Sequence, residues 1–334
     1  MTFDFRRPST LVPLLLLCGL ALVPVVATAL DQPFWIAFFA RIVIYAIAAS
    51  ALNLALGYGR LVSFGHALFL GLGAYAVALP SFYEVDSGIV HLALCLAVCA
   101  VAAGVTGAIS LRTSGIAFIM ITLAFAQMGY FFFVSLKNFG GDDGLAIVST
   151  SRFGPLNLGS PLAVYAVAFV VLVLATWWLA RLRVAPFGMA LRGARQNARR
   201  INAIGLQSLR LQLTAYVLSG MLCGVSGLLL ANLNAYASPS TLAWTVSGEL
   251  IVMVVLGGMG SVWGPLLGAL AFLGLEEVLK GWTEHWMAVF GPLIVLMALA
   301  GKHGLAGLLQ RLDHTRTVGV STSPAAPASA EGHA

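Results

Sequence analysis

Apolar residues form long stretches along this chain, and short connections between them hold most of the polar and charged residues. A membrane-spanning helix needs about 20 consecutive apolar residues. Apolar stretches of 15 to 30 residues cover 11–30, 34–56, 61–79, 89–111, 115–136, 161–180, 213–233, 250–279 and 286–300. The pattern therefore predicts an all-α polytopic membrane protein with about ten transmembrane or re-entrant helices, in one bundle from residue 11 to residue 301.

The composition supports the same class. Hydrophobic residues make up 60% of the chain and charged residues 9%, whereas about a quarter of a soluble domain is charged. No convincing set of catalytic side chains falls on one membrane face, so we expect a transporter rather than an enzyme, without a cofactor, metal or nucleic-acid partner. We expect neither a disulfide nor a metal site from the four cysteines, which all lie in apolar stretches: Cys18, Cys95, Cys99 and Cys223.

The distribution of charge predicts the orientation of the helices, because basic connections stay in the cytoplasm. The basic positions expected inside are Arg6, Arg7, Arg60, Arg112, the arginines of residues 181–212, Lys302, Arg311 and Arg316, and the acidic positions expected outside are Asp31, Glu84 and Asp86. Two cytoplasmic termini require an even number of crossings, so residues 250–279 should contain a break. The break is expected at the glycines from Gly257 to Gly264, in the interior of the bundle.

Both ends of the chain allow further predictions. Residues 1–30 resemble a secretory signal because Arg6 and Arg7 precede an apolar run that ends in small residues. The run is long for a signal and many spans follow it, so we expect an uncleaved first helix after a cytoplasmic N-terminus at residues 1–10, with a cleaved signal as the alternative. Residues 302–334 are expected to form a disordered cytoplasmic tail, in which Ser, Pro and Ala dominate from Thr315 onward.

Residues 181–212, the arginine segment, concentrate positive charge. Seven of the eighteen basic residues lie between Arg181 and Arg210, and no acidic residue occurs from Gly144 through Gly248. Between Phe187 and Gly205 the spacing predicts a short amphipathic helix. Its apolar face would carry Leu191, Ala194, Ala198 and Ile201, and another face Arg192, Arg195 and Arg199.

Three roles suit such a helix. It could lie on an anionic membrane surface, dock into a groove on a cytoplasmic partner, or only fix the orientation of the chain. Small residues, including Ala190, Gly193 and Ala194, would let another protein approach closely, which orientation alone does not require. We therefore favour docking.

Glycine-rich segments place polar groups at membrane depth. Residues 52–75 combine many glycines with Asn53, Ser63 and His66, and such groups either bond a neighbouring helix or contact a solute that crosses the membrane. His66 fits both interpretations. Glu249, like Glu276 and Glu277, lies near the end of a stretch, where water could reach it. An ion-coupled transporter working alone is a rival hypothesis, but only His66 and Glu249 could serve it.

Several blocks along residues 40–300 together resemble the LivM-type permease subunit of the branched-chain amino acid ABC importer family. They are residues 45–53, 57–67 and 71–75, then 112–126, 140–144, 187–205, 238–240 and 249–269. The resemblance implies the helical fold of type II ABC importer permeases, located in the bacterial inner membrane. It also implies a second related permease, two ABC ATPase subunits and an extracytoplasmic solute-binding protein as partners.

The resemblance assigns roles to individual residues. It identifies the ATPase-coupling residues as Phe187, Leu191, Arg192, Arg195, Ala198, Arg199, Ala203, Ile204 and Gly205. Together with the polar pattern, it nominates for the translocation pathway Asn53, Ser63, Gly65, His66, Tyr75, Glu249, Gly257 and Gly258. ATP hydrolysis is expected on another chain, because no phosphate-binding loop of the G-x4-G-K-[ST] type occurs here.

Two positions depart from the family pattern. Arg60 stands where the family usually has glycine, and the arginine segment lacks the acidic residues that the family usually intersperses. The implied substrates are leucine, isoleucine and valine, and relatives that import urea, short amides or other small organic acids supply the alternatives.

Overall fold

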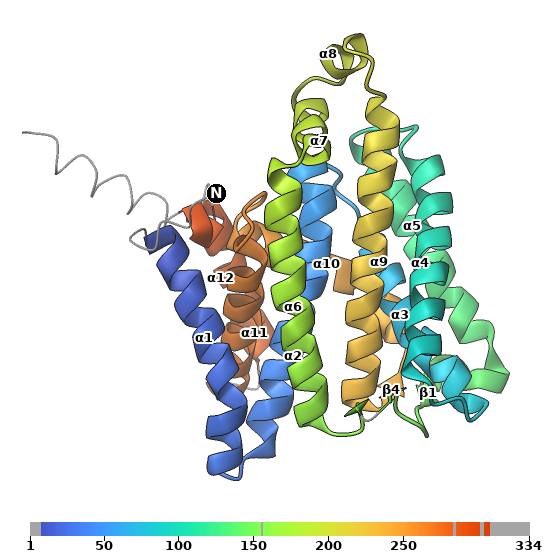
Figure 1. Ribbon diagram of the computed structural model, residues 1–334, viewed down its shortest axis with the longest axis vertical. Coiled ribbons are helices and arrows are strands. Elements are labelled where there is room, and N and C mark those ends of the chain that lie inside the picture. The colour runs from blue at the N-terminus through green and yellow to red at the C-terminus, as the bar shows by residue number, and fades with distance from the viewer. Residues whose placement is uncertain (1–7, 155, 283–284, 301–303, 308–334) are drawn as a thin grey trace, which may run out of the picture.

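The chain folds into a helical bundle, which confirms the predicted all-α membrane architecture (Figure 1). The computed structural model describes residues 8–154, 156–282, 285–300 and 304–307. Predictions for residues 1–7, for Lys302, Arg311 and Arg316 and for the tail from residue 308 lie outside the described residues.

Most of the predicted stretches correspond to one helix each. The helices are α1 (Pro8–Ala29), α2 (Pro33–Asn53), α3 (His66–Phe82), α4 (Gly88–Ser110), α5 (Ile116–Ser135), α6 (Pro161–Val184), α7 (Pro186–Gln196), α8 (Ala198–Ala203), α9 (Ser208–Asn234), α10 (Trp244–Gly257), α11 (Gly264–Trp282) and α12 (Trp286–Ala300). A π-helical turn, η1 (Leu54–Tyr58), extends α2, and the 3-10 turns are η2 (Lys137–Phe139), η3 (Gly141–Asp143) and η4 (Pro239–Leu242). The strands are β1 (Leu145–Ala146), β2 (Arg152–Phe153), β3 (Leu156–Asn157) and β4 (Tyr236–Ala237); β1 pairs with β4 and β2 with β3, both antiparallel.

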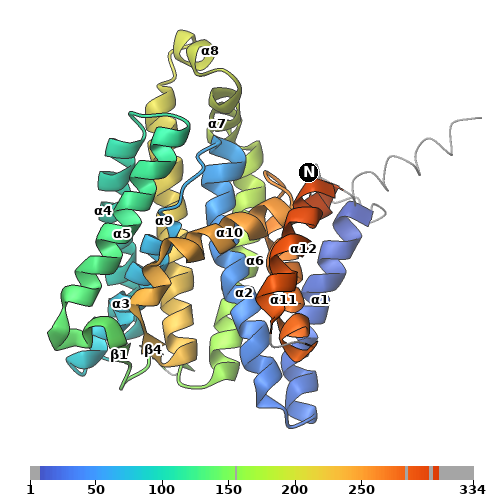
Figure 2. The same ribbon diagram turned by 180° about the vertical axis from the view of Figure 1, so that it is seen from behind.

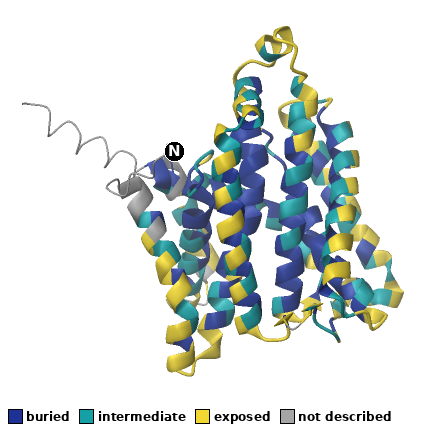
Figure 3. Cartoon of the chain, in the orientation of Figure 1, coloured by how far each residue is buried: buried dark blue, intermediate teal, exposed yellow. Residues whose placement is uncertain are grey.

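In the described part of the chain, five helical segments are long and apolar enough to cross a membrane: Pro33–Tyr58, α4, α5, α6 and α9. Residues Leu15–Ala29, α3 and α10 form shorter apolar helices. α2 is buried without interruption from Ile42 to Asn53, and with α3 and α9 it forms the centre of the bundle (Figure 3). α4, α5 and α6 instead expose large apolar side chains, such as Val101, Phe131 and Val170, which suit contact with lipid.

Small residues set the distance between α3 and α9. A Cβ atom at Gly227 of α9 would overlap the carbonyl oxygen of Leu70 in α3, so the two backbones touch, as small-residue faces allow between membrane helices. Replacing Gly227 with valine is expected to destabilise the bundle by about 1–3 kcal/mol, the usual cost of overpacking, seen as a lower melting temperature in detergent. Gly104→Val is the control because a Cβ at Gly104 meets no atom within 4 Å; equal melting of the two variants would contradict this account.

The predicted break within residues 250–279 is present. α10 ends at Gly257, and α11 begins at Gly264. Gly258 has a φ of 114°, which L-residues with a side chain rarely adopt. α10 crosses α2 obliquely, and α11 runs back beside it (Figure 2).

The two ends of the bundle differ in charge. α7 and α8 lie at one end, the arginine end, and β1 and β4 lie at the other, the far end (Figures 1 and 2). Arg60 and the α4–α5 turn lie beside α7 at the arginine end, whereas the α1–α2 turn with Asp31 and the α3–α4 turn with Glu84 lie at the far end. The basic and acidic positions are therefore separated as the charge pattern predicts.

Candidate functional site

The arginine segment forms two helices rather than the one that we predicted from Phe187 to Gly205. Asn197 has extended backbone angles (φ −154°, ψ 97°) between α7 and α8, and its side-chain oxygen accepts a hydrogen bond of 3.1 Å from the backbone N–H of Arg200. Asparagine favours such a capping position over a helix interior, so the single-helix prediction was wrong at this residue. The predicted stop is present, since Gly205 follows α8 with a φ of 87°.

The two helices differ in how they meet the bundle. Leu191 is buried in a cluster with Leu54, Tyr58 and Leu179, and Phe187 packs against its edge. Ala194 is also buried, so α7 is seated on the bundle. Five predicted coupling residues are instead exposed on or just after α8: Ala198, Arg199, Ala203, Ile204 and Gly205.

The predicted arginine face is divided in the same way. Arg192 donates hydrogen bonds from Nη2 to the carbonyl of Arg183, at 2.8 Å, and from Nε to that of Gly188, at 3.4 Å. Arg195 donates from Nη1 to the carbonyl oxygen of Gly57 in η1. Arg192 and Arg195 therefore hold α7 to its own chain, and Arg199 projects from α8.

Gly57 belongs to a contact between the π-helical end of α2 and the break between α10 and α11. We call this contact, residues 53–57 and 257–261, the glycine junction. The side chain of Asn53 joins the two parts: its Nδ2 donates to the carbonyl of Ser261 at 2.8 Å, and its Oδ1 accepts from the backbone N–H of Gly260 at 2.8 Å. A Cβ atom at Gly57 would lie 2.6 Å from the nitrogen of Gly260. The structure thus brings together three predicted pathway residues, Asn53, Gly257 and Gly258, and connects them to α7 through Arg195.

A second group of predicted pathway residues lies where α3 meets α9. His66 is fully buried, and its Nε2 lies 2.8 Å from the hydroxyl of Ser219, which donates to the carbonyl of Ala51. Ser63 lies 3.4 Å from the hydroxyl of Tyr216 and accepts a hydrogen bond from the N–H of Gly65. These contacts match the helix-bonding interpretation of His66, although its Nδ1 has no partner within the described chain.

Tyr75 lies apart from both groups. Its ring stacks on Phe133 of α5 with 3.9 Å between the ring centroids. Tyr75 is buried, and its hydroxyl has no hydrogen-bond partner among the described residues.

Glu249 belongs to a group of charges that sequence reasoning did not recognise. Its electrostatic neighbours are Glu276, Arg41 and Lys280. Arg41 is exposed on α2, and its guanidinium carbon lies 5.7 Å from the ring centroid of Tyr45. A signal was available, because Arg41 is a lone charge inside the apolar stretch 34–56. We call Arg41, Glu249, Glu276 and Lys280 the charged face.

A cavity of about 510 Å³ lies at the arginine end. Ala194 and Arg195 of α7 form one side, and the α4–α5 turn, Arg60 and Gln212 form the rest. Arg60 has a φ of 59°, the left-handed region that favours glycine, which accounts for the glycine usual at this position in the resembling family. α7 is thus packed on one side and borders open space on the other.

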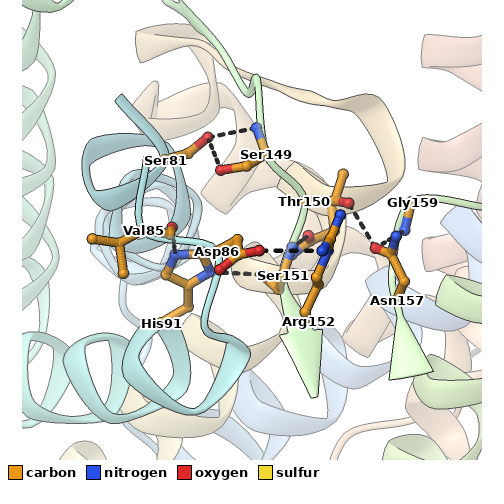
Figure 4. A network of polar contacts seen from close by, with 11 residues as sticks. Ser81, Val85, Asp86, His91, Ser149, Thr150, Ser151, Arg152, Asn157 and Gly159 are labelled. Atoms are coloured by element: carbon orange, nitrogen blue, oxygen red, sulfur yellow. Dashed lines mark hydrogen bonds and ion pairs between the residues drawn. The ribbon is translucent and has the colours of Figure 1, made fainter. Parts of the chain in front are cut away.

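A polar network closes the far end (Figure 4). The Nδ1 of His91 lies 2.8 Å from the Ser151 hydroxyl, and its Nε2 lies 3.0 Å from the carbonyl of Val85. Asp86 pairs with Arg152 at 3.5 Å, and the N–H of Ser151 donates to Asn232 of α9 at 2.9 Å. The loop after α5 is therefore fastened to both α4 and α9.

In the described part of the chain, no group of three or more His, Cys, Asp or Glu residues could hold a metal ion. Cys95, Cys99 and Cys223 are buried there as free thiols, and Cys18 is exposed.

Comparison with known proteins places the sequence near a transport family. Residues 34–298 match the family described as the permease component of branched-chain amino acid transport systems. The permease protein LivM of the high-affinity branched-chain amino acid transport system of Escherichia coli K12 is 27% identical over 286 residues, which cover 78% of this chain and 67% of that protein.

Two further relatives match shorter parts. The permease protein LivH of the same Escherichia coli system is 24% identical over 147 residues, 43% of this chain and 46% of that protein. The fructose import permease FrcC of Rhizobium meliloti is 28% identical over 154 residues, 43% of this chain and 42% of that protein. No solved structure matches the chain significantly.

Proposed function

The chain belongs to the permease family of branched-chain amino acid transport systems, and from this membership we propose that it is a transmembrane subunit of an ATP-driven importer for leucine, isoleucine and valine. Its proposed partners are a second related permease, two ABC ATPase subunits and an extracytoplasmic solute-binding protein. LivM and LivH are named as permeases of one system, and their joint similarity to this chain supports a paired permease.

The observation that carries the proposal is the position of α7. It is seated on the bundle, and it is linked by Arg195 to the glycine junction, where the π-helical end of α2 meets the break between α10 and α11. Discontinuous membrane helices are typical of transport sites. A cytoplasmic ATPase that moved α7 and α8 would therefore act directly on them.

We infer that the arginine end faces the cytoplasm, in accordance with the positive-inside rule. The exposed residues of α8, including Arg199 and Ile204, then form the contact with an ATPase. The acidic far end would face outward, where the solute-binding protein delivers its ligand.

The relatives are named for different substrates, so the substrate is proposed separately from the transport function. LivM and LivH are named for branched-chain amino acids and FrcC for fructose. The match to LivM covers more of the chain than the match to FrcC, which favours an amino acid as the substrate. An amino acid carries both a positive and a negative charge, whereas a sugar, urea or an amide does not.

Uptake by the complete complex tests the function. Proteoliposomes that contain this chain, the second permease and the ATPases are expected to import labelled leucine only when ATP and the solute-binding protein are both supplied. The matched control omits this chain. Leucine import by this chain alone without ATP would instead support an independent secondary transporter, and a solute-binding protein specific for urea or an amide would overturn the proposed substrate.

A further inference from the structure

The charged face lies within the helical bundle rather than at its capped ends. Arg41 is eight residues into α2, about 12 Å along the helix axis. Glu249 is five residues into α10, and Glu276 is six residues before the end of α11. α2 begins and α11 ends toward the far end, whereas α10 crosses α2 obliquely (Figure 2). The three helices pack against one another, so their charged side chains lie along the length of the bundle.

Such charges are costly in lipid. Ionisable residues in membrane helices nearly always face protein or water and often mark the path of a solute or an ion. Arg41 is nevertheless exposed, and Glu249 is only half-buried. The face formed by α2, α10 and α11 is therefore a poor lipid contact and a good wall for a water-filled passage.

The charges on this face balance one another, with two of each sign. Glu276 is paired with Lys280, with 2.6 Å between Oε1 and Nζ. Arg41 and Glu249 lie on helices that pack against each other and are within electrostatic range, but no ion pair joins them in the described part of the chain. A positive and a negative group thus stand near each other, and each can still bind another partner.

We propose that Arg41 and Glu249 recognise the two charges of an α-amino acid in the translocation pathway, Arg41 binding its carboxylate and Glu249 its ammonium group. The inference rests on the proposed function and adds a selectivity site to it. A guanidinium forms two parallel hydrogen bonds with a carboxylate, and a neutral solute such as a sugar or urea cannot replace both interactions. Since Arg41 lies on the surface of the bundle, the opposite wall of the passage belongs to another subunit of the complex.

Neutral replacements test the two side chains in the complete complex. Arg41→Gln and Glu249→Gln are each expected to lower kcat/KM for leucine uptake by about 10- to 100-fold, the effect of losing a charge-assisted hydrogen bond. Assembly and the affinity of the solute-binding protein for leucine should not change. Glu277→Gln is the matched control: it is half-buried on α11 next to the charged face, and its uptake should stay within about twofold of wild type.

A charge exchange separates recognition from a structural ion pair. In the double variant Arg41→Glu with Glu249→Arg, a pair that only holds helices together would be restored and uptake would return, which would overturn the inference. Recognition predicts that uptake stays low, because the carboxylate and ammonium sites have exchanged places relative to the passage. Wild-type kinetics in Arg41→Gln and Glu249→Gln would overturn the inference alone, whereas a wild-type complex that imports no amino acid would overturn the proposed function.

Discussion

Replacing Asn53 with leucine is expected to abolish uptake and to destabilise the bundle by at most about 2–6 kcal/mol. Two half-buried backbone groups lose their partner, and the loss costs about 1–3 kcal/mol for each such group that is fully buried. Asn53 is fully buried, and its amide satisfies the N–H of Gly260 and the carbonyl of Ser261. Leucine has a similar volume, but it can neither accept from the first group nor donate to the second. The lost hydrogen bonds are those that hold the end of α2 to the break between α10 and α11 in the glycine junction.

Thermal unfolding in detergent and leucine uptake by the complete complex measure the two consequences. Asn138→Leu is the control, because it makes the same replacement at an exposed position in η2 and should leave both properties near wild type. If the Asn53 variant melted and transported like the Asn138 variant, the junction would not depend on this amide.

The membrane helices could be predicted from the sequence because their signal is local. An apolar stretch of sufficient length predicts a membrane helix by itself, and the glycines after residue 256 predict the break between α10 and α11. The separation of charge between the two ends could be predicted for the same reason, since Arg60, Arg112 and the arginine segment act independently of one another.

The contacts that define the candidate site could not be predicted in this way. Asn53 and Gly260 are 207 positions apart, and Arg195 is 138 positions from Gly57, so no local pattern joins them. The hydrophobic period also runs through Asn197 without a break, although this residue caps α8. The helical period therefore assigned Arg192, Arg195 and Arg199 to one common face, whereas folding divides them.

The pathway residues illustrate the same limit. Their polarity selected Asn53, Ser63, His66 and Glu249, but polarity does not distinguish a side chain that bonds a neighbouring helix from one that faces a passage. The side-chain amide of Asn53 forms hydrogen bonds to Ser261 and Gly260 within the chain. Glu249 lies within electrostatic range of Glu276 and Arg41, and Arg41 lies outside the glycine-rich segments. Their roles in transport remain predictions.

Replacing Arg195 with alanine is expected to uncouple ATP hydrolysis from import. Its guanidinium is the polar link between α7 and Gly57 of the glycine junction, and the loss of a charge-assisted hydrogen bond shifts a two-state equilibrium by about 10- to 100-fold. The complex should still assemble, because the exposed residues of α8 are unchanged. The measurement is the number of leucine molecules imported per ATP hydrolysed, which should fall by about tenfold or more while ATPase activity continues.

Two neighbouring arginines make this prediction specific. Arg192→Ala removes only hydrogen bonds to the nearby carbonyls of Arg183 and Gly188, so it should loosen α7 without breaking its connection to the junction, and the import ratio should change less. Arg199→Glu alters an exposed side chain on α8, and it should weaken co-purification of the ATPase, with uptake and ATP hydrolysis lost together. A normal ratio of import to hydrolysis in Arg195→Ala would show that the movement of α7 reaches the glycine junction through another contact. The packing of Leu191 against Leu54 and Tyr58 would then be the candidate.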